Sequence, residues 1–597
     1  MYEIKISVRN LVEFIMRSGD LSVSSTGLKD ANAMQEGTRI HKKLQRKAGA
    51  GYHAEVALSH TSEVTYDDLT FQITVEGRAD GIYSDELGWN IDEIKGIYRD
   101  IHTLSEAIPV HRAQALCYGL IYALQNTLDG IGIRITYCHI PTEEVRYFHE
   151  FISFAELQNW YDTLLASYAK WASWQIRWQE ERNNNIKSLE FPFSYRDGQN
   201  TLVKGVYQSI LRKKRLYIEA PTGVGKTIST IFPAVKSLGE NVSEKIFYLT
   251  AKTITRTVAE DTLFLLQEKK VPLKSVTLTA KEKICFLEKP ACNPAQCDYA
   301  KGHFDRVNDA VFDLLTHETI MTRETILEYA KKHMVCPFEM ALDTATWCDF
   351  IIGDYNYAFD PTASLKRFFS VDKENNFVFL IDEAHNLVSR ARDMYSASLT
   401  KEDFLAMKKL VKVRSRRVAN ALDGCNRALL ELKRSCDELE KFDFLETESL
   451  VLKLMRLSTI MEEFFQEQEH PHPSFPTTPL PPSDKEQLLN FYFEIRSFQN
   501  IYELVDEHYI IYGDYTSDGH FVLHLQCMDP SANLDLYLKK SRCSVFFSAT
   551  FLPIHYYREQ LAGREDDYAI YAPSPFSPDK RLLMIGKDVS TKYNLRT

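Results

Sequence analysis

The stretch Ala220-Pro221-Thr222-Gly223-Val224-Gly225-Lys226-Thr227 decides the fold of this chain. It follows an apolar run, Leu216–Ala220, and precedes a helical pattern. Small residues let backbone N–H groups close around phosphates, and the N-terminus of the following helix adds positive potential. Lys226 would reach the β- and γ-phosphates of ATP, and the Thr227 hydroxyl would bind Mg²⁺. The predicted nucleotide-binding residues of this loop are Gly223, Gly225, Lys226 and Thr227.

An acidic motif lies 155 residues beyond the phosphate loop. The apolar run Phe377–Ile381 ends in Asp382-Glu383-Ala384-His385. A carboxylate at the C-terminal end of a strand lies where an open α/β sheet places its ligand contacts. We therefore expect Asp382 to hold Mg²⁺, directly or through water, and Glu383 to orient and deprotonate the attacking water. With Lys226, these two carboxylates are the predicted catalytic residues of an ATP hydrolase.

Other segments fit a parallel sheet built around the same nucleotide. From about 191 onward, apolar runs alternate with helical patterns, which is typical of a buried parallel sheet with helices on both faces. Tyr195, Arg196 and Gln199 precede the phosphate loop at the distance expected of residues on the adenine side. Gln199 is therefore predicted to bind the nucleotide.

Four of the eleven cysteines form a set between the second strand and the acidic motif. Cys285, Cys292, Cys297 and Cys336 have the spacing C-x6-C-x4-C-x38-C. Four thiolates can hold a [4Fe–4S] cluster or a zinc ion. Zinc sites usually use two closely spaced pairs, and the second pair is missing here. The spacing leaves the metal open, and core cysteines without a metal are a third interpretation.

The order of the motifs resembles that of the XPD/DinG family of iron–sulfur superfamily 2 DNA helicases, across about 190–597. The shared segments are the phosphate loop, the cysteine set, Asp349–Tyr357, the Asp-Glu-Ala-His motif and Ser548-Ala549-Thr550. Ala220, in place of the first glycine of the strict phosphate-loop pattern, is also usual in superfamily 2 helicases. The resemblance implies that the four cysteines hold a [4Fe–4S] cluster, whereas Cys348 is expected to be a packing residue.

The resemblance also implies how the motor would meet DNA. Thr250-Ala251-Lys252-Thr253 would contact a DNA backbone, and His385 would couple the ATP site to nucleic acid. Ser548-Ala549-Thr550 would link hydrolysis to movement, which would run 5′→3′ on single-stranded DNA. A helical Arch domain is expected at 391–540.

Residues 1–180 carry a second pattern. Asp80 is followed by Glu93-Ile94-Lys95, and side chains two residues apart on a strand point to the same face. Asp80 and Glu93 can then share Mg²⁺ or Mn²⁺, while Lys95 positions the attacking water and stabilises charge on the phosphate. The pattern resembles that of the PD-(D/E)XK nucleases, and the predicted catalytic residues are Asp80, Glu93 and Lys95.

Two more matches favour a RecB-like nuclease fold. Gly37-x3-His41 lies on an early predicted helix, and Gln114-x3-Tyr118 lies on the helix after the Glu-x-Lys strand. The predicted metal ligands are His41, Asp80 and Glu93, and Glu55 is a weaker candidate. An exposed strand face is the alternative explanation of Glu-x-Lys, and a surface histidine is the alternative for His41.

The predicted fold is α/β, with an α/β nuclease-like domain at 1–180, a linker at 181–190 and a RecA-like parallel-sheet motor. The motor occupies 191–280, 341–390 and 541–597. It is interrupted by an iron–sulfur domain at 281–340 and by the Arch-like insertion at 391–540. A helicase of this family uses a second RecA-like domain, and the sequence ends at Thr597, soon after Thr550. We expect that domain to be absent from this sequence, so that this chain alone binds nucleotide and unwinds poorly.

Composition sets limits on partners and setting. The chain of 597 residues is 44% hydrophobic and 26% charged, with a net charge of −11, so it is not a uniformly basic DNA-coating protein. DNA contacts would need local basic grooves. The basic run Arg212–Arg215 is interpreted as a solvated face. The N-terminus lacks the pattern of a signal peptide, and no apolar stretch is long enough to span a membrane. The cysteines are spread through the chain, and a cytoplasmic location is expected.

The leading hypothesis is an ATP-dependent DNA helicase coupled to a metal-dependent DNA nuclease, acting in DNA repair or processing. Its partners would be single-stranded or junction DNA and other repair proteins. Two alternatives stay open. In one, the N-terminal nuclease fold only binds DNA. In the other, the chain is a non-catalytic DNA-binding scaffold switched by nucleotide.

Overall fold

The computed structural model describes most of the chain, namely residues 2–22, 30–49, 51–86, 88–97, 101–140, 142–369, 375–439, 443, 446–469, 479–576, 578–580, 582–584, 586 and 592. It divides into two compact units. The first contains Met1–Asn184 and Thr279–Trp347, and the second contains Asn185–Leu278 and Cys348–Thr597. Among the described residues, no helix combines the length and apolar character needed to cross a membrane.

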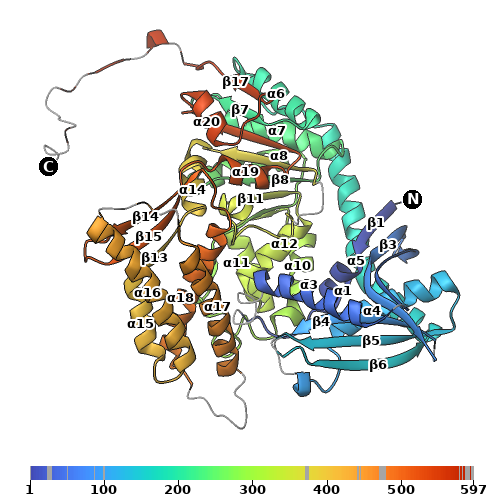
Figure 1. The fold of residues 1–597 in the computed structure, drawn as a ribbon. Helices are drawn as coiled ribbons and strands as arrows, with labels where there is room; N and C mark the ends of the chain where they lie inside the picture. The colour runs from blue at the N-terminus through green and yellow to red at the C-terminus, as the bar shows by residue number, and fades with distance from the viewer. Residues whose placement is uncertain are drawn as a thin grey trace. The chain divides into compact units, whose positions relative to one another are not determined.

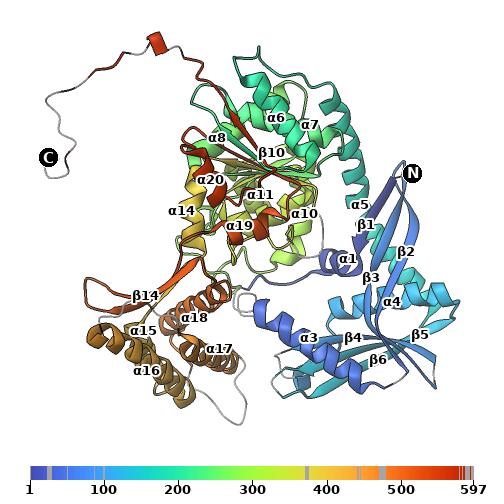
Figure 2. The same ribbon diagram turned by 45° about the horizontal axis from the view of Figure 1, so that its top comes forward.

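The first unit is built on a six-stranded mixed sheet (Figure 2). The strands lie in the order β1-β3-β4-β5-β6, and β2 pairs with β3. Neighbours β1/β3 and β4/β5 are parallel, whereas β2/β3, β3/β4 and β5/β6 are antiparallel. The bounds are β1 Tyr2–Ser7, β2 Tyr52–Tyr66, β3 Leu69–Asp85, β4 Gly88–Ile97, β5 Gly130–His139 and β6 Val145–Ser153.

Helices pack beside this sheet and supply the core. Phe71, Ile73 and Val75 alternate along β3 and are fully buried, as period-two burial requires. Helix α4 contributes a long buried stretch against β4 and β5, and α3 lies beside β4. The helices of this part are α1 Val8–Met16, α3 Asp30–Lys47, the 3-10 turn η1 Ile101–Thr103, α4 Pro109–Asn126 and α5 Phe154–Lys187.

The cysteine-bearing segment folds together with this N-terminal part. Its elements are α9 Lys281–Ile284, α10 His303–His317, β10 Ile320–Met321, α11 Arg323–His333 and α12 Pro337–Trp347. The ring of Trp171, on α5, lies 4.7 Å from that of Trp347 and 5.0 Å from that of Phe312. Arg17 forms an ion pair with Asp343 at 2.7 Å. Trp171 is therefore a core residue, and it ties the two segments together.

The predicted linker, 181–190, is largely helical, because helix α5 continues to Lys187. Arg182 and Ile186 are buried there, because the polar composition covers only one face of the helix. The boundary between the two compact units, Asn184/Asn185, falls within this segment, so it connects the units through a helix rather than a loop.

The second unit contains the predicted parallel sheet (Figure 1). Its strands lie in the order β9-β11-β8-β12-β16-β7-β17, and each neighbouring pair among them is parallel. The bounds are β7 Leu216–Glu219, β8 Lys245–Leu249, β9 Ser275–Thr277, β11 Phe350–Gly353, β12 Phe377–Asp382, β16 Cys543–Ser548 and β17 Tyr568–Tyr571. Strands β7, β11, β12 and β16 are buried at every residue, as expected of a sheet covered on both faces.

Helices follow these strands in the α/β manner. They are α6 Gln199–Arg212, α7 Lys226–Gly239, α8 Thr253–Glu268, α13 Asn356–Phe359, α14 His385–Met394, α19 Ser531–Leu538, α20 Ile554–Gln560 and the 3-10 turn η2 Pro578–Lys580. The carboxyl ends of β7, β8, β12 and β16 share one edge of the sheet, since parallel strands point the same way. The loops at that edge carry the predicted nucleotide motifs.

The insertion at 391–540 is mostly helical, as expected, but it also contains a small sheet. Helices α15 Lys401–Val411, α16 Arg416–Leu439, α17 Glu448–Glu469 and α18 Pro482–Tyr502 lie side by side (Figure 1). Strands β13 Ala397–Thr400, β14 Tyr509–Tyr515 and β15 Phe521–Cys527 form an antiparallel sheet in the order β13-β15-β14. No local sequence pattern predicts this sheet, because β13 and its partner β15 are far apart in the chain.

Candidate functional site

The phosphate loop connects β7 to α7. Gly223 and Gly225 have φ angles of 94° and 77°, which lie in the left-handed region that favours glycine. A Cβ on Gly225 would also come within 2.8 Å of Gln199 Nε2. Lys226 begins α7, and its Nζ donates to the carbonyl of Ala220 at 2.9 Å. The loop thus has the backbone conformation and the helix start that a phosphate cradle requires.

The acidic motif lies at the same edge of the sheet. Asp382 ends β12, which is separated from β7 by β16 alone. The Tyr248 hydroxyl, at the end of β8, donates to Asp382 Oδ2 and also contacts Thr227. The charges of Glu383 and Asp382 both act on Lys226. Lys226, Thr227 and the two carboxylates are therefore brought together around one point.

Burial gives this cluster its electrostatic character. Desolvation raises the pKa of Asp382 to about 6, and the neighbouring charge of Glu383 adds to the rise, while the Tyr248 hydrogen bond opposes it. Desolvation also lowers the pKa of Lys226. A buried carboxylate whose ionised form is destabilised gains from a nearby cation. The residues present thus fit a Mg²⁺-bound triphosphate.

The turn after Asp382 is held by specific hydrogen bonds. Glu383 has a φ of 49°, a left-handed conformation that costs energy in a residue with a Cβ. Its N–H donates to Asp382 Oδ1 at 2.8 Å. The Tyr355 hydroxyl donates to the carbonyl oxygens of Asp382 and Glu383. These contacts fix the direction of the Glu383 carboxylate, and sequence reasoning had missed both Tyr248 and Tyr355.

The acidic motif also contacts the Ser-Ala-Thr segment. His385 Nδ1 lies 2.8 Å from Ser548 Oγ and 3.3 Å from a Glu383 carboxylate oxygen. The Ser548 hydroxyl in turn accepts the N–H of Thr550 at 3.1 Å. The structure therefore joins two motifs that lie 163 residues apart in the sequence.

Three residues that precede the phosphate loop in the sequence lie on the predicted adenine side of the site, and two of them contact the loop. Gln199 begins α6 and is buried, and its Nε2 donates to the carbonyl of Val224 at 3.1 Å. Its Oε1 accepts the N–H of Arg196 at 3.0 Å, and the Arg196 guanidinium donates to the carbonyl of Gly223. Tyr195 stacks on Phe191 at 4.4 Å. Gln199 thus contacts the phosphate loop, and its contact with the nucleotide stays a prediction.

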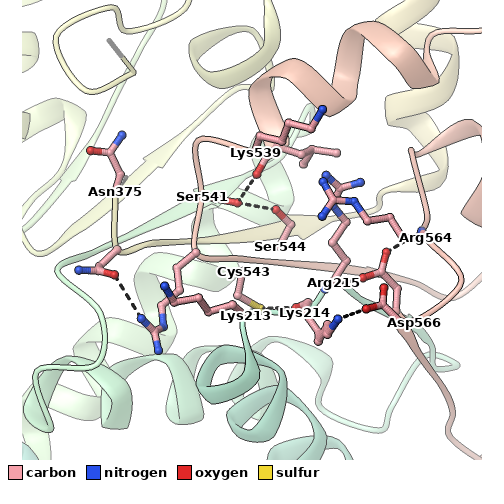
Figure 3. Close-up of a pocket in the computed structure, with 14 residues that line it drawn as sticks. Lys213, Lys214, Arg215, Asn375, Lys539, Ser541, Cys543, Ser544, Arg564 and Asp566 are labelled. Atoms are coloured by element: carbon pink, nitrogen blue, oxygen red, sulfur yellow. Dashed lines mark hydrogen bonds and ion pairs between the residues drawn. The ribbon is translucent and has the colours of Figure 1, made fainter. Parts of the chain in front are cut away.

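A cavity of about 210 Å³ lies at the opposite, amino-terminal edge of the same sheet (Figure 3). Its basic lining side chains engage neighbours: Lys214 pairs with Asp566, and Arg215 pairs with Asp535. Arg542 donates to the carbonyl of Ile210 at 3.0 Å. Arg215 is only 6% exposed, so the interpretation of Arg212–Arg215 as a solvated face was wrong for this residue. The cavity and the phosphate loop lie at opposite edges of the sheet, so the cavity is not part of the nucleotide site.

The four predicted cysteine ligands line one small cavity of about 20 Å³ in the first unit. Leu21, Phe286 and Pro337 are among the apolar residues around it. Burial raises the pKa of the Cys336 thiol to about 11, and it also raises that of Cys292. All four thiols are free, and Cys348 is buried elsewhere in the packing, as predicted.

The lining of this cavity bears on the metal. The four cysteines line it together with residues that are mostly apolar. Four thiolates in such a shell fit a metal centre with cysteine ligands, and both a [4Fe–4S] cluster and a zinc ion accept this donor set.

The second candidate site lies on the sheet of the first unit. Lys95 Nζ donates to Glu93 Oε1 at 2.6 Å, which confirms that these side chains share a strand face. His41, on α3, places Nδ1 3.4 Å from Asp80 Oδ1. The N–H of Ile94 donates to Asp80 Oδ2 at 2.8 Å. The predicted residues His41, Asp80, Glu93 and Lys95 are therefore brought together, and Glu55 joins them.

The electrostatics of this site are those of a cation-binding cluster. Burial, followed by the charge of Asp80, raises the pKa of Glu93 to about 7. Glu93 Oε2 is buried and has no hydrogen-bond partner. The hydrogen bond and charge of Asp80 raise the pKa of His41, although burial opposes them. An orphaned buried carboxylate oxygen beside a second carboxylate fits a divalent ion.

Some residues near this cluster stabilise the sheet but do not face the predicted metal site. Asp92 points to the other face of β4, where it accepts from Tyr52 at 2.9 Å and from Arg134 at 2.7 Å. A Cβ on Gly81 would lie 1.8 Å from the Tyr52 hydroxyl, so glycine is required for that hydrogen bond. Gln114 and Tyr118 lie on α4, as predicted, and both are buried.

Known proteins are similar to part of this chain. Residues 250–404 match the DEAD_2 family model. The matched segment contains the acidic motif and all four clustered cysteines. The chain is also similar to a regulator of telomere elongation helicase 1 homolog of Caenorhabditis briggsae, with 24% identity over 332 residues, 47% of this chain and 33% of that protein.

A second relative is the general transcription and DNA repair factor IIH helicase subunit XPD/RAD3 of Saccharomyces cerevisiae. It is 27% identical over 197 residues, which cover 33% of this chain and 22% of that protein. A solved XPD helicase structure is 17% identical and covers 68% of each chain, with a TM-score of 0.41. The chain spans about a third or less of the length of these two curated relatives, which are named as helicases.

Proposed function

We propose that the second unit contains the first RecA-like domain of an ATP-dependent DNA helicase. The observation that carries this proposal is the Tyr248 hydroxyl, which contacts both Thr227 and Asp382. It joins the phosphate loop to the acidic motif at the carboxyl edge of a parallel sheet, where α/β proteins bind nucleotides. The match of residues 250–404 to the DEAD_2 model and the similarity of the chain to relatives named as helicases support the same assignment.

Each residue has a role in this proposal. The loop around Gly223 and Gly225 would hold the phosphates with backbone N–H groups, and Lys226 would neutralise the γ-phosphate. Bound Mg²⁺ would supply Lewis-acid stabilisation of the transferring phosphoryl group, held by Thr227 and Asp382. Glu383 would accept the proton of the attacking water. Gln199 would contact the adenine side.

The test is DNA-stimulated ATP hydrolysis by the full chain. Lys226→Ala should abolish nucleotide binding, because the phosphate charge loses its partner. Glu383→Gln should still bind nucleotide but hydrolyse it about 10²- to 10⁴-fold more slowly, the usual contribution of a general base. Equal turnover by the wild type and both variants would refute the assignment. ATP turnover that DNA stimulates would exclude the nucleotide-switched scaffold.

We further propose that Cys285, Cys292, Cys297 and Cys336 hold a [4Fe–4S] cluster. The apolar cavity that all four line supports this, as does the resemblance of the motif order to that of iron–sulfur helicases. By resemblance, the motor would move 5′→3′ on single-stranded or junction DNA, with 391–540 as the Arch domain. A cytoplasmic location and partnership with other repair proteins also remain predictions.

A second function is proposed for the N-terminal sheet: metal-dependent cleavage of DNA. The convergence of His41, Asp80, Glu93 and Lys95, with an unpartnered Glu93 oxygen, favours it. A bound divalent ion would supply an activated water and charge stabilisation. Asp80, Glu93 and His41 would hold that ion, and Lys95 would orient the water and stabilise negative charge on the phosphate. A domain that binds DNA without cutting it is the competing function.

A further inference from the structure

Glu55 has an unusual place in the sheet of the first unit. Strands β2 and β3 are antiparallel, and Ala54 pairs with Gly81 while Val56 pairs with Ala79. Glu55 therefore lies opposite Asp80. Its φ is 55°, and within the described strands it is the one non-glycine residue with a left-handed backbone. Such a conformation persists only where the surroundings enforce it, and it is common at ligand sites.

The Glu55 carboxylate belongs to the tightest group of potential metal ligands in the described structure. One donor atom from each of His41, Glu55 and Asp80 lies within 4.8 Å of the other two. Gln45, one helical turn after His41, donates its Nε2 to Glu55 Oε1 at 3.2 Å and to the carbonyl of Asp80 at 2.9 Å. The same amide therefore links the Glu55 side chain to the β3 backbone at Asp80.

The charge around this group is unbalanced without a cation. Glu55, Asp80 and Glu93 bring three carboxylates together, and Lys95 is the lysine that contacts one of them. Glu93 is only 4% exposed, and its Oε2 has no hydrogen-bond partner. A buried carboxylate oxygen left without a partner is costly unless a ligand or ion satisfies it. This orphaned oxygen indicates an ion independently of the His41 group.

We propose that Glu55 is a fourth ligand of the divalent ion, beside His41, Asp80 and Glu93, and that the site prefers Mn²⁺ to Mg²⁺. The proposal rests on the nuclease function proposed above and names a ligand which that function does not require. Mg²⁺ favours oxygen ligands and gives up water reluctantly, whereas Mn²⁺ accepts an imidazole nitrogen together with carboxylates. The left-handed backbone conformation of Glu55 would direct its carboxylate toward the ion.

Calorimetric titration of the nucleotide-free full chain with MnCl₂ and MgCl₂ tests this proposal. The wild type should bind Mn²⁺ more tightly than Mg²⁺. Glu55→Gln keeps the size of the side chain but removes its charge, and should weaken Mn²⁺ binding by about tenfold or more, since even outer-shell changes cost 10- to 100-fold. Glu63→Gln removes an exposed carboxylate from the same strand and should leave binding unchanged.

A second measurement separates the ligand from the backbone. Glu55→Gly suits the left-handed φ, so it should raise the thermal midpoint of the metal-free protein while losing most of the midpoint increase that Mn²⁺ gives the wild type. Asp67→Gly is the matched control, because Asp67 has a φ of 51° in the turn after β2. It should also raise the midpoint, yet keep the full Mn²⁺ effect.

Asp80→Asn distinguishes failure of this inference from failure of the nuclease proposal. If Glu55→Gln binds Mn²⁺ like the wild type while Asp80→Asn does not, Glu55 is not a ligand and the metal site stands without it. If Asp80→Asn also binds like the wild type, no metal site exists on this sheet and both proposals fall. Equal wild-type affinity for Mn²⁺ and Mg²⁺ would overturn the stated preference.

Discussion

His385 Nδ1 lies 2.8 Å from Ser548 Oγ, and this single contact connects the acidic motif to the Ser-Ala-Thr segment. The histidine also faces the Glu383 carboxylate at 3.3 Å. A change at Glu383 during hydrolysis can therefore reach β16 and the loop after it through two side chains. We infer that Ser548 is a positioning residue for coupling rather than a group that touches nucleotide.

Substitution Ser548→Ala tests this coupling. The variant should keep basal ATP hydrolysis within a few-fold of the wild type, because no nucleotide contact is lost. It should lose most of the stimulation by single-stranded DNA. Ser544→Ala is the control, since Ser544 is buried on the same strand but bonds to Ser541. Unchanged DNA stimulation in Ser548→Ala would contradict the proposed role.

Asp382 predicts a pH dependence of stability. Its pKa is raised from 3.8 to about 6 in the folded protein, mainly by burial. The folded state then binds this proton more tightly than the unfolded chain, so the free energy of unfolding falls as pH rises from about 4 to 6. Above that pH range, the free energy of unfolding is lower by on the order of 3 kcal/mol. A bound cation should remove most of it.

Thermal unfolding of the metal-free protein across this pH range measures the effect. Asp382→Asn should flatten the fall and raise the midpoint at neutral pH, while abolishing ATP turnover. Tyr248→Phe should make the fall steeper, because it removes a hydrogen bond that stabilises the ionised carboxylate. If Asp382→Asn is less stable than the wild type at pH 7, the ionised Asp382 carboxylate does not destabilise the folded protein and this prediction is wrong.

Local patterns made much of the motor predictable. The strands ending at Glu219, Asp382 and Ser548 are continuous apolar runs, and the motifs after them are short and specific. Tyr248 and Tyr355 could not be singled out in the same way. Tyr248 lies in an aromatic, apolar strand, and Tyr355 lies between Asp354 and Asn356 in the shared segment Asp349–Tyr357. The polar role of each tyrosine depends on which strands become neighbours.

Long-range pairing explains the other differences. The sheet β13-β15-β14 joins segments from the two ends of the insertion, so no local sequence pattern predicts it. Arg215 looked like part of an exposed basic run, but its partner Asp535 is more than 300 residues away. Glu55 is only a weak candidate ligand in the sequence, because its position opposite Asp80 depends on the β2/β3 register.

The cysteine set gives a spectroscopic prediction. Purified anaerobically, the full chain should contain iron and sulfide and absorb in the near-visible range, and Cys297→Ser should lose that absorbance. Cys348→Ser is the control, because Cys348 is buried in packing away from the cavity. Retained absorbance in Cys297→Ser, or stoichiometric zinc in place of iron, would overturn the assignment.

The nuclease proposal depends on Asp80, whose two carboxylate oxygens face different partners. Oδ2 accepts the Ile94 N–H at 2.8 Å, which leaves Oδ1 beside His41 at 3.4 Å for an ion. Asp80→Ala should therefore abolish Mg²⁺- or Mn²⁺-dependent cleavage of single-stranded DNA while leaving ATP hydrolysis unchanged. Asp92→Asn, on the opposite face of β4, should affect folding stability more than cleavage by folded protein, because Asp92 is bound to Tyr52 and Arg134. If the wild type binds DNA but cleaves none with either metal, the domain is a binding module. If Asp80→Ala cleaves as well as the wild type, the catalytic site lies elsewhere.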